Sequence, residues 1–325
     1  MKRTGIILLC LLAAASFAVA EGTSEKGTEA QWPKGPVQII VGARAGGGTD
    51  LMARIFSDYL QRELESPVVV VNQPAGGGTV AYEQVRTAKP DGQTLLFMHT
   101  GMIIYNHTGR YDHPVSDFTT IAIAQSYPPQ VYAVADDAPW DNMKDFVEDA
   151  RRNPGKRTVG VALGGTTHFI AGTIMMEENV ELKLVEAASE VDKVAAIQGG
   201  HIDIGNLGSS SAAQYEEAGK MKVLCLIDPT PDPKYPQYVP AIDQGLNFSW
   251  IAPLVVWGPK GMDPAIVEQI NTATKNMATD PEVQEQLKKM SSAYQYYTVQ
   301  EAQELIRKED EKIAALADKL GLATE

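Results

Sequence analysis

Three glycine-rich segments contain the residues of this sequence whose types and spacing best suit the binding of a small anion. The first reads Ala-Arg-Ala-Gly-Gly-Gly-Thr-Asp over residues 43–50 and lies between a predicted strand and a predicted helix. Consecutive glycines bring backbone N–H groups within reach of a ligand, and the helix that follows contributes a positive N-terminal end. The segment lacks the lysine and the spacing of a nucleotide-binding loop, so it predicts no phosphate-rich cofactor. A tight turn capped by Thr49 or Asp50 is the alternative interpretation.

The same kind of segment recurs at two similar places. Residues 75–79 follow the second predicted strand, and residues 163–168 follow the first strand of a second strand-helix series. Ligands of open α/β sheets bind beyond the carboxyl ends of the strands, where all three segments are expected to lie. We therefore expect two lobes to clamp one anion, with directional hydrogen bonds from the hydroxyl groups of Thr166 and Thr167 and a hinge motion that closes the site.

The alternation of apolar strands with helical segments predicts an α/β fold. Runs such as residues 37–41 and 68–71 are β-rich and mainly apolar, which is typical of strands in a mostly parallel sheet that helices cover on both faces. The series begins again after Asn153, which predicts a second lobe. The predicted division gives lobe 1 residues 32–126 and 252–325, lobe 2 residues 127–251, and hinges near residues 127–134 and 251–258.

The N-terminus predicts export from the cytoplasm. Lys2 and Arg3 precede an apolar run that ends in small residues, which indicates a cleaved signal peptide over residues 1–20 and a flexible segment over residues 21–31. Cys10 lacks the small preceding residue that lipid attachment requires, so we favour a free periplasmic or otherwise extracytoplasmic protein over a lipoprotein. Cys225 is then the remaining cysteine, and no disulfide can form within one molecule.

Charge and motifs argue against two classes of protein. The chain of 325 residues has a net charge of −13, which makes nucleic acid an unfavourable partner. An exported hydrolase on the same scaffold is a second hypothesis, but the sequence lacks the G-x-S-x-G and H-E-x-x-H motifs, and its five histidines lack the spacing of metal ligands. We therefore expect no catalytic residue, no metal and no cofactor.

Several segments, in their order and spacing, resemble the extracytoplasmic substrate-binding receptors of tripartite tricarboxylate transporters. They include the AGGGTD segment that ends at Asp50, PVVVVN over residues 67–72, KPDGQTLL over residues 89–96, GGTTHFIAG over residues 164–172 and GGHID over residues 199–203. The resemblance implies a Venus flytrap of the type II-like periplasmic-binding-protein fold. It also implies a receptor that captures a di- or tricarboxylate, or another small organic carboxylate, and delivers it to membrane subunits. We expect such a receptor to be a monomer, and a ligand-sensing accessory of a membrane signalling system is the alternative role.

The resemblance and the glycine segments together give the candidate ligand-binding residues. They are Arg44, Ala45, Gly46, Gly47, Gly48, Thr49, Asp50, Gly76, Gly77, Thr100, Gly101, Gly165, Thr166, Thr167, His168 and Asp203. Two of them carry open alternatives: His168 packs or caps at the start of its helix, and Asp203 caps a turn at a strand end.

The sequence departs from the family pattern at two places. Gly42-Ala43-Arg44 stands where many members have a proline and an aromatic residue, and the guanidinium of Arg44 either pairs with a second ligand carboxylate or stays in solvent. Glu-Ala-Ala-Ser over residues 186–189 replaces a common Pro-Tyr-Lys-Gly segment, so the far part of the pocket is expected to differ.

Overall fold

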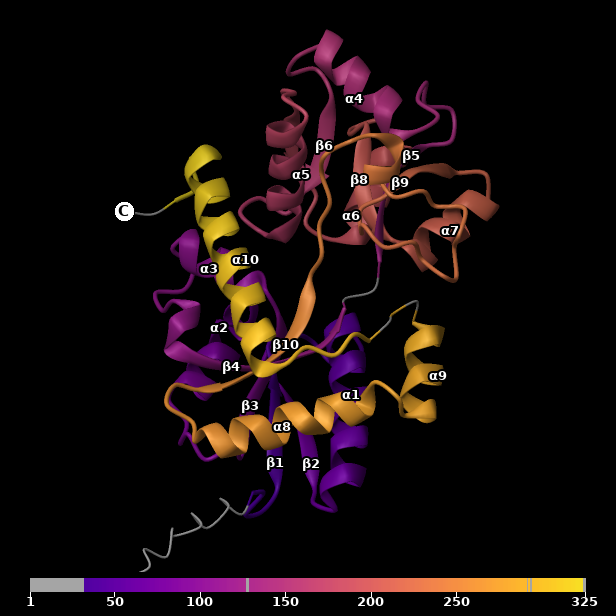
Figure 1. The fold of residues 1–325 in the computed structure, drawn as a ribbon. Coiled ribbons are helices and arrows are strands. Elements are labelled where there is room, and N and C mark those ends of the chain that lie inside the picture. Colours follow the sequence, from indigo (N-terminus) through magenta and orange to yellow (C-terminus); the bar gives the residue numbers. More distant parts are fainter. Residues whose placement is uncertain (1–31, 127–128, 291, 293, 324–325) are drawn as a thin grey trace, which may run out of the picture.

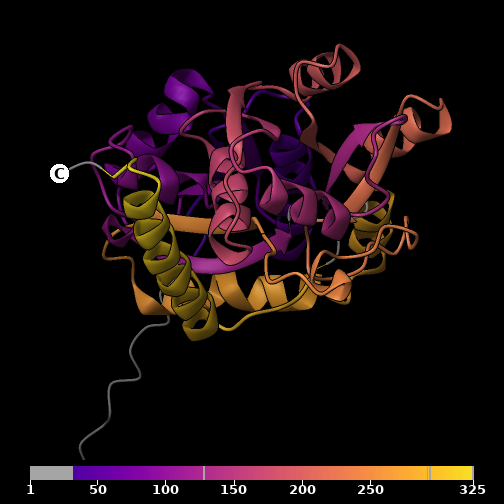
Figure 2. The ribbon, with the colours of Figure 1, turned by 90° about the horizontal axis from the view of Figure 1, so that it is seen from above.

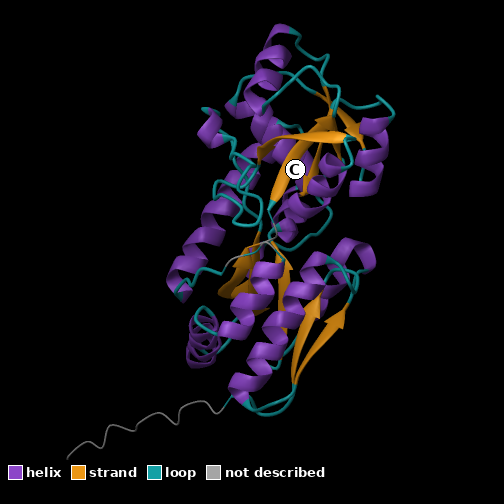
Figure 3. Cartoon of the chain, turned by 90° about the vertical axis from the view of Figure 1, so that its right-hand side faces the viewer, coloured by secondary structure: helices purple, strands orange, loops and turns teal. Residues whose placement is uncertain are grey.

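The chain forms two lobes, one above the other in Figure 1. The computed structural model describes residues 32–126, 129–290, 292 and 294–323. Each lobe contains a five-stranded sheet, and Figure 3 shows helices packed around both sheets. The predicted signal peptide, residues 1–20, and the predicted flexible segment, residues 21–31, lie outside the described residues.

The two sheets share one pattern of strand order, β2-β1-β3-β10-β4 in lobe 1 and β7-β6-β8-β5-β9 in lobe 2. The strands are β1 (Val37–Val41), β2 (Val68–Asn72), β3 (Thr94–His99), β4 (Phe118–Ser126), β5 (Gln130–Ala135), β6 (Thr158–Val161), β7 (Lys183–Glu186), β8 (Ile204–Gly208), β9 (Met221–Leu226) and β10 (Pro253–Pro259). The α-helices are α1 (Gly48–Leu64), α2 (Thr79–Arg86), α3 (Gly101–His107), α4 (Met143–Arg152), α5 (Thr166–Glu177), α6 (Glu190–Gln198), α7 (Ser209–Glu217), α8 (Pro264–Met277), α9 (Pro281–Lys289) and α10 (Val299–Lys319).

Both sheets are mostly parallel, as the apolar strands predicted. On β1, Ile39 and Ile40 are both fully buried, and they belong to separate hydrophobic clusters. Because successive residues of a strand point to opposite faces, both faces of this sheet are covered. Each sheet has one strand that runs against its neighbours, β10 in lobe 1 and β5 in lobe 2.

These two antiparallel strands show how the lobes are joined. Gln130, which begins β5, pairs with Gly208, which ends β8, and Pro253, which begins β10, pairs with Ser126, which ends β4. The chain therefore leaves each sheet and enters the other at the edge where the parallel strands end. A strand that enters directly at this edge, without a helix to reverse the chain, must run antiparallel to the others. The carboxyl edges of the two sheets consequently face each other.

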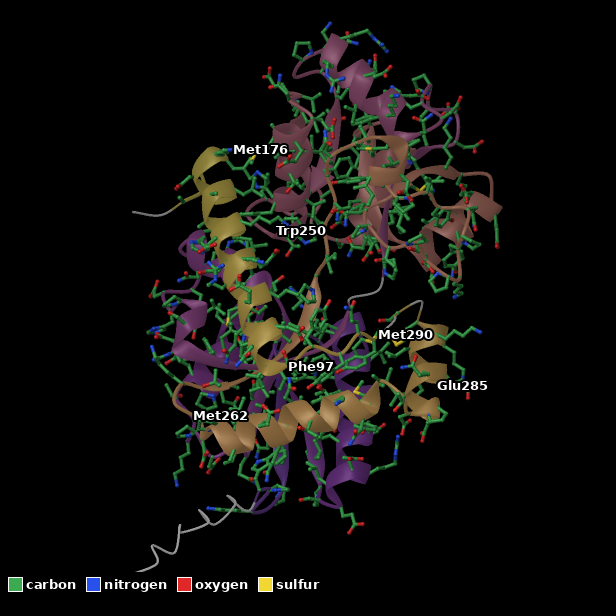
Figure 4. All side chains as sticks on the ribbon, viewed as in Figure 1. Phe97, Met176, Trp250, Met262, Glu285 and Met290 are labelled. Atoms are coloured by element: carbon green, nitrogen blue, oxygen red, sulfur yellow. The ribbon has the colours of Figure 1, made fainter. Side chains whose placement is uncertain are left out.

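Helix α10 contacts both lobes and lies along one side of the molecule (Figure 2). In lobe 1, Asp310 of α10 lies 2.8 Å from Nε2 of His107. In lobe 2, Leu320 at the end of α10 packs against Gly172 of α5 so closely that a Cβ atom at Gly172 would lie 2.6 Å from its Cδ1. Trp250, on the chain segment that returns to lobe 1, lies beside this helix (Figure 4), with Nζ of Lys312 4.1 Å from its ring centroid.

Asn271 of α8 connects the sheet of lobe 1 to the segment that precedes α10. Its fully buried amide donates to the carbonyl oxygens of Ile121 (2.9 Å) and Tyr297 (3.1 Å), and it accepts from the hydroxyl of Tyr296 (2.7 Å). Because Asn271→Ala leaves buried carbonyl groups without this donor, we expect it to lower the free energy of unfolding by about 2 kcal/mol in urea denaturation.

A matched control is Asn276→Ala, at an exposed position of the same helix whose side chain bonds Glu63 at the surface. It should change the free energy of unfolding by less than about 0.5 kcal/mol. Equal decreases in the free energy of unfolding of the two variants would contradict the stabilising role of the buried Asn271 amide.

Candidate functional site

The first two glycine segments lie against each other at the carboxyl edge of the lobe 1 sheet. A Cβ atom at Gly42 would lie 3.0 Å from the Cα of Gly78, and one at Gly78 would lie 2.9 Å from the carbonyl oxygen of Gly42. Gly78 also has a φ of 105°, which favours glycine. This close backbone approach brings Gly76 and Gly77 next to residues 43–50.

The carboxylate of Asp50 is directed into the first segment and away from solvent. The residue is 1% exposed, and its two oxygens accept hydrogen bonds from the backbone N–H of Gly46 (2.8 Å), from Asn72 Nδ2 (2.9 Å) and from Nε and Nη2 of Arg54 (3.0 Å each). Burial favours the neutral carboxyl, but the hydrogen bonds from Arg54, Gly46 and Asn72 hold the pKa of Asp50 below its ordinary value. Asp50 therefore shapes the loop, and its oxygens are already occupied.

Side chains hold the second-lobe segment in the same manner. The hydroxyl of Thr167 accepts from the N–H of Ala162 (2.7 Å), and Nδ1 of His168 accepts from the N–H of Gly164 (2.9 Å). Burial lowers the pKa of His168, although the charge of Glu186 opposes this, so the ring is neutral near pH 7. Thr167 and His168 thus hold the loop in place by accepting hydrogen bonds from its backbone.

Helices α1 and α5 begin with unpaired backbone donors. Their N-caps are Gly47 and Gly165, which supply no side-chain cap. Among the described helices, side chains cap α4, α6, α8, α9 and α10, whereas α2, α3 and α7 also begin without a side-chain cap. Among the described residues, the N–H groups of residues 48–50 and 166–167 have no hydrogen-bond partner. Free donors at the positive ends of two helices, on two facing edges, are what an anion requires.

Thr166 keeps its hydroxyl free of any hydrogen bond to the described part of the chain. The residue lines a cavity of about 40 Å³ together with Pro129, Gln130, Trp250 and Ala252, where the chain passes between the lobes. Its side chain is therefore better placed to meet a ligand than that of Thr167, which is used within the loop.

The remaining candidates of lobe 1 differ in exposure. Thr100 is 2% exposed, and the N–H of Gly101 donates to Nδ1 of His99 (2.9 Å), whose pKa burial lowers to about 4. Arg44 and Ala45 are exposed, and Arg44 forms no ion pair with another described residue. Arg44 is thus free to meet a ligand, whereas Thr100 acts through the packing of its turn.

Arg110, which the sequence analysis did not single out, links the two lobes. It follows α3 in lobe 1, and its Nη2 donates to the carbonyl oxygen of Leu163 in lobe 2 (3.0 Å). Its guanidinium also lies 5.5 Å from the ring centroid of Tyr105. Since a lone arginine after a helix belongs to no motif, nothing in the sequence marks it.

Asp203 does not belong to this site, and the prediction that it faces the cleft is wrong. It immediately precedes β8, and its Oδ2 accepts from the N–H (2.7 Å) and the hydroxyl (2.8 Å) of Thr158, which begins β6. Both strands run from this point toward the glycine segments. Asp203 therefore lies at the opposite edge of the sheet, roughly 17 Å away along a five-residue strand. It holds the start of β6 through Thr158, whereas the alternative interpretation had it capping a turn at a strand end.

A larger cavity adjoins the one that Thr166 lines, since Pro129 and Asp228 line both. It has a volume of about 550 Å³ and lies between α10 and the segments on either side of Trp250, where Pro231, Ile251, Tyr294 and Leu305 line it. The described residues contain no group of three or more side chains suited to hold a metal ion. None of the helices in the described part of the chain combines the length and apolar character needed to cross a membrane.

Two α/β lobes joined at their facing edges, each with an uncapped glycine segment, define the fold of a solute-binding receptor. The structure is similar to the crystal structure of a TctC solute binding protein from Polaromonas without ligand, with a TM-score of 0.77 and 23% identity over 89% of this chain and 100% of that chain. It is also similar to an R. palustris protein with adipate, with a TM-score of 0.73 and 22% identity over 90% of this chain and 99% of that chain.

Sequence comparison gives the family. The chain is 28% identical over 327 residues to the UPF0065 protein in gbd 5'region of Cupriavidus necator, covering 99% of each sequence. The profile of the tripartite tricarboxylate transporter family receptor, TctC, matches residues 52–322. The chain belongs to this family, so it is an extracytoplasmic solute-binding receptor and not an enzyme.

Asp50→Asn should reveal the contribution of this carboxylate through its dependence on pH. We expect the variant to lose about 2 kcal/mol of unfolding free energy at neutral pH, because it loses charge-assisted hydrogen bonds. The folded-state pKa of Asp50 lies below the unfolded value of about 3.9. The stabilisation is therefore complete above the unfolded value and is lost as the pH falls through the folded value.

Urea denaturation of the wild-type protein and of Asp50→Asn should thus give a difference in the free energy of unfolding that becomes smaller below about pH 4. Asp58→Asn, at an exposed position of the same helix, is the matched control and should show little difference at any pH. If the difference in the free energy of unfolding between wild type and Asp50→Asn did not change with pH, the stabilising role of the Asp50 carboxylate would be contradicted.

Proposed function

We propose that this receptor captures a small organic carboxylate between residues 43–50 and 163–168 and delivers it to the membrane subunits of a tripartite tricarboxylate transporter. The observation that carries the proposal is the pair of uncapped helix starts, with free N–H groups on α1 in lobe 1 and on α5 in lobe 2. A carboxylate between them accepts hydrogen bonds from both lobes, so its binding favours a closed arrangement. The adipate in the R. palustris relative supports this class of ligand.

The residues then divide into two roles. The N–H groups of residues 48–50 and 166–167, with the hydroxyl of Thr166, bind the carboxylate. Asp50, Thr167 and His168 hold the loops that present these donors. Arg44 and Arg110 supply positive charge at the edge of lobe 1, which compensates locally for the acidic net charge of the chain.

The proposal keeps the predicted organisation of the chain. Residues 32–126 and 252–325 form one moving body and residues 127–251 the other, with hinges near residues 127–134 and 251–258. A signal peptide over residues 1–20 directs the receptor out of the cytoplasm, and the receptor works as a monomer.

A thermal-shift screen of residues 21–325 tests carboxylate capture directly. The panel contains mono-, di- and tricarboxylates, aromatic acids and acidic amino acids. A ligand that binds only the folded protein raises its stability by about 2.7 kcal/mol at a hundredfold excess over the dissociation constant, so a true ligand should raise the melting temperature clearly. A folded protein, free of co-purified ligand, that no carboxylate stabilises would contradict the proposal.

Thr166→Val and Thr167→Val form a matched pair that distinguishes a side chain that contacts the ligand from one that holds the loop in place. Thr166→Val removes a hydroxyl without an internal partner, so we expect an affinity about tenfold weaker in calorimetric titration and an unchanged melting temperature of the empty protein. Thr167→Val removes the acceptor of the Ala162 N–H and should lower the melting temperature itself. If Thr166→Val destabilised the empty protein as much, its side chain would be structural.

A further inference from the structure

Lys193 of α6 has a buried side chain whose ammonium group reaches solvent without an ion-pair partner among the described residues. The residue is 3% exposed, and its ammonium group forms no hydrogen bond or ion pair with any described residue. Burial lowers its pKa to about 8, against the attraction of the carboxylates of Glu190, Asp192 and Glu186. A lysine that is largely desolvated and leaves its ammonium group without an internal partner is a candidate for contact with a ligand.

Two glycines make room for the side chain of Lys193. Gly160 of β6 and Gly205 of β8 are register partners on adjacent strands. A Cβ atom at Gly160 would lie 3.4 Å from the Cγ of Lys193, and one at Gly205 would lie 3.2 Å from its Cβ and 3.5 Å from its Cδ. The aliphatic stem therefore lies flat on the sheet at a place where larger residues would displace it.

This stem leads toward the facing edge of lobe 2. Helix α6 begins after β7 at that edge, and side chains of a helix lean toward its N-terminus. Two of the acids that attract the ammonium group lie there as well: Glu186 accepts from the N–H of Leu163 (2.9 Å), and Glu190 accepts from the N–H of Gly208 (3.0 Å). The ammonium group is thus directed to the edge that carries the second glycine segment.

We infer that Lys193 is a ligand-binding residue, which donates a hydrogen bond to a hydroxyl group at the end of the ligand remote from its carboxylate. This inference rests on the proposed function. Glu186 and Glu190 are exposed and each uses one oxygen, Oε2, on a backbone N–H, so their other oxygens are open to a donor. A hydroxyl group accepts from the ammonium and donates to a carboxylate, whereas a second ligand carboxylate meets two like charges. The preferred ligand is therefore a hydroxy carboxylate.

Three acids of equal chain length test this inference in calorimetric titrations: a dicarboxylate, the ω-hydroxy acid and the unsubstituted alkanoate. The wild-type protein should bind the hydroxy acid about tenfold more tightly than either of the others. Lys193→Met should bind the hydroxy acid no better than the alkanoate. The empty variant should melt at about the same temperature, because the ammonium group has no internal hydrogen bond or ion pair to lose.

Lys183→Met is the matched control. Lys183 is exposed and begins β7, at the edge of the sheet opposite to the glycine segments, so its loss should leave all three affinities unchanged. If Lys193→Met kept the wild-type affinity for the hydroxy acid, the role of Lys193 would be overturned while carboxylate capture stood. A wild-type preference for the dicarboxylate would overturn the hydroxyl assignment. Binding of none of the acids, at any chain length, would overturn the proposed function itself.

The pH dependence of binding gives a second measurement of the same residue. The charged groups that face the ammonium are Glu186 from β7 and Glu190 and Asp192 from α6, while β6 and β8 present glycines there. Carboxyl side chains as a class titrate in the acidic range. Affinity for the hydroxy acid should therefore be steady below a pH of about 8 and fall above it by about tenfold in all, to the affinity for the alkanoate. Lys193→Met should abolish this fall, and a wild-type affinity that stayed constant to higher pH would overturn the contact.

Discussion

The way the chain passes between the lobes determines where a ligand can bind. Both crossings join the carboxyl edges of the sheets, as the pairings of Gln130 with Gly208 and of Pro253 with Ser126 show. The loops that follow the parallel strands are therefore brought to facing edges of the two sheets by the path of the chain. Helices that begin at these loops point their N-terminal ends across the same space, so the fold places two positive helix ends opposite each other before any side chain is considered.

Side chains near the site mostly hold backbone in place. Asp50, Thr167, His168, Glu186 and Glu190 each accept a hydrogen bond from a loop N–H group. These bonds fix the loops, while the N–H groups at the starts of α1 and α5 remain free. In the proposed site, recognition of a carboxylate therefore depends on main-chain donors. In the same proposal, selection between ligands depends on side chains that have no internal partner among the described residues, such as Arg44, Thr166 and Lys193.

The sequence predicted the elements of this structure better than the roles of single residues. Apolar runs separated by glycine-rich segments located the strands that end at the site, such as those over residues 37–41 and 68–71. Asp203 was misplaced because the resemblance put it among the ligand-binding residues, whereas it precedes β8 and is held by Thr158 at the edge where these strands begin. Arg110 and Lys193 could not be recognised at all. Their positions depend on contacts with residues of other strands and loops, such as Leu163, Gly160 and Gly205.

Helix α10 limits how the proposed closure can occur. It is anchored to lobe 1 through Asp310 and His107, yet its end packs on Gly172 in lobe 2 with almost no space between. A motion that separated the lobes on this side would break that contact and the one between Lys312 and Trp250. A rotation of the lobes about an axis near α10 keeps both contacts. Such a rotation moves the side of the cleft that lies farthest from α10 by the largest amount. The hydrogen bond from Arg110 to Leu163 already joins lobe 1 to lobe 2. The carboxyl edges of the two sheets therefore need to move closer only at the place where the ligand binds.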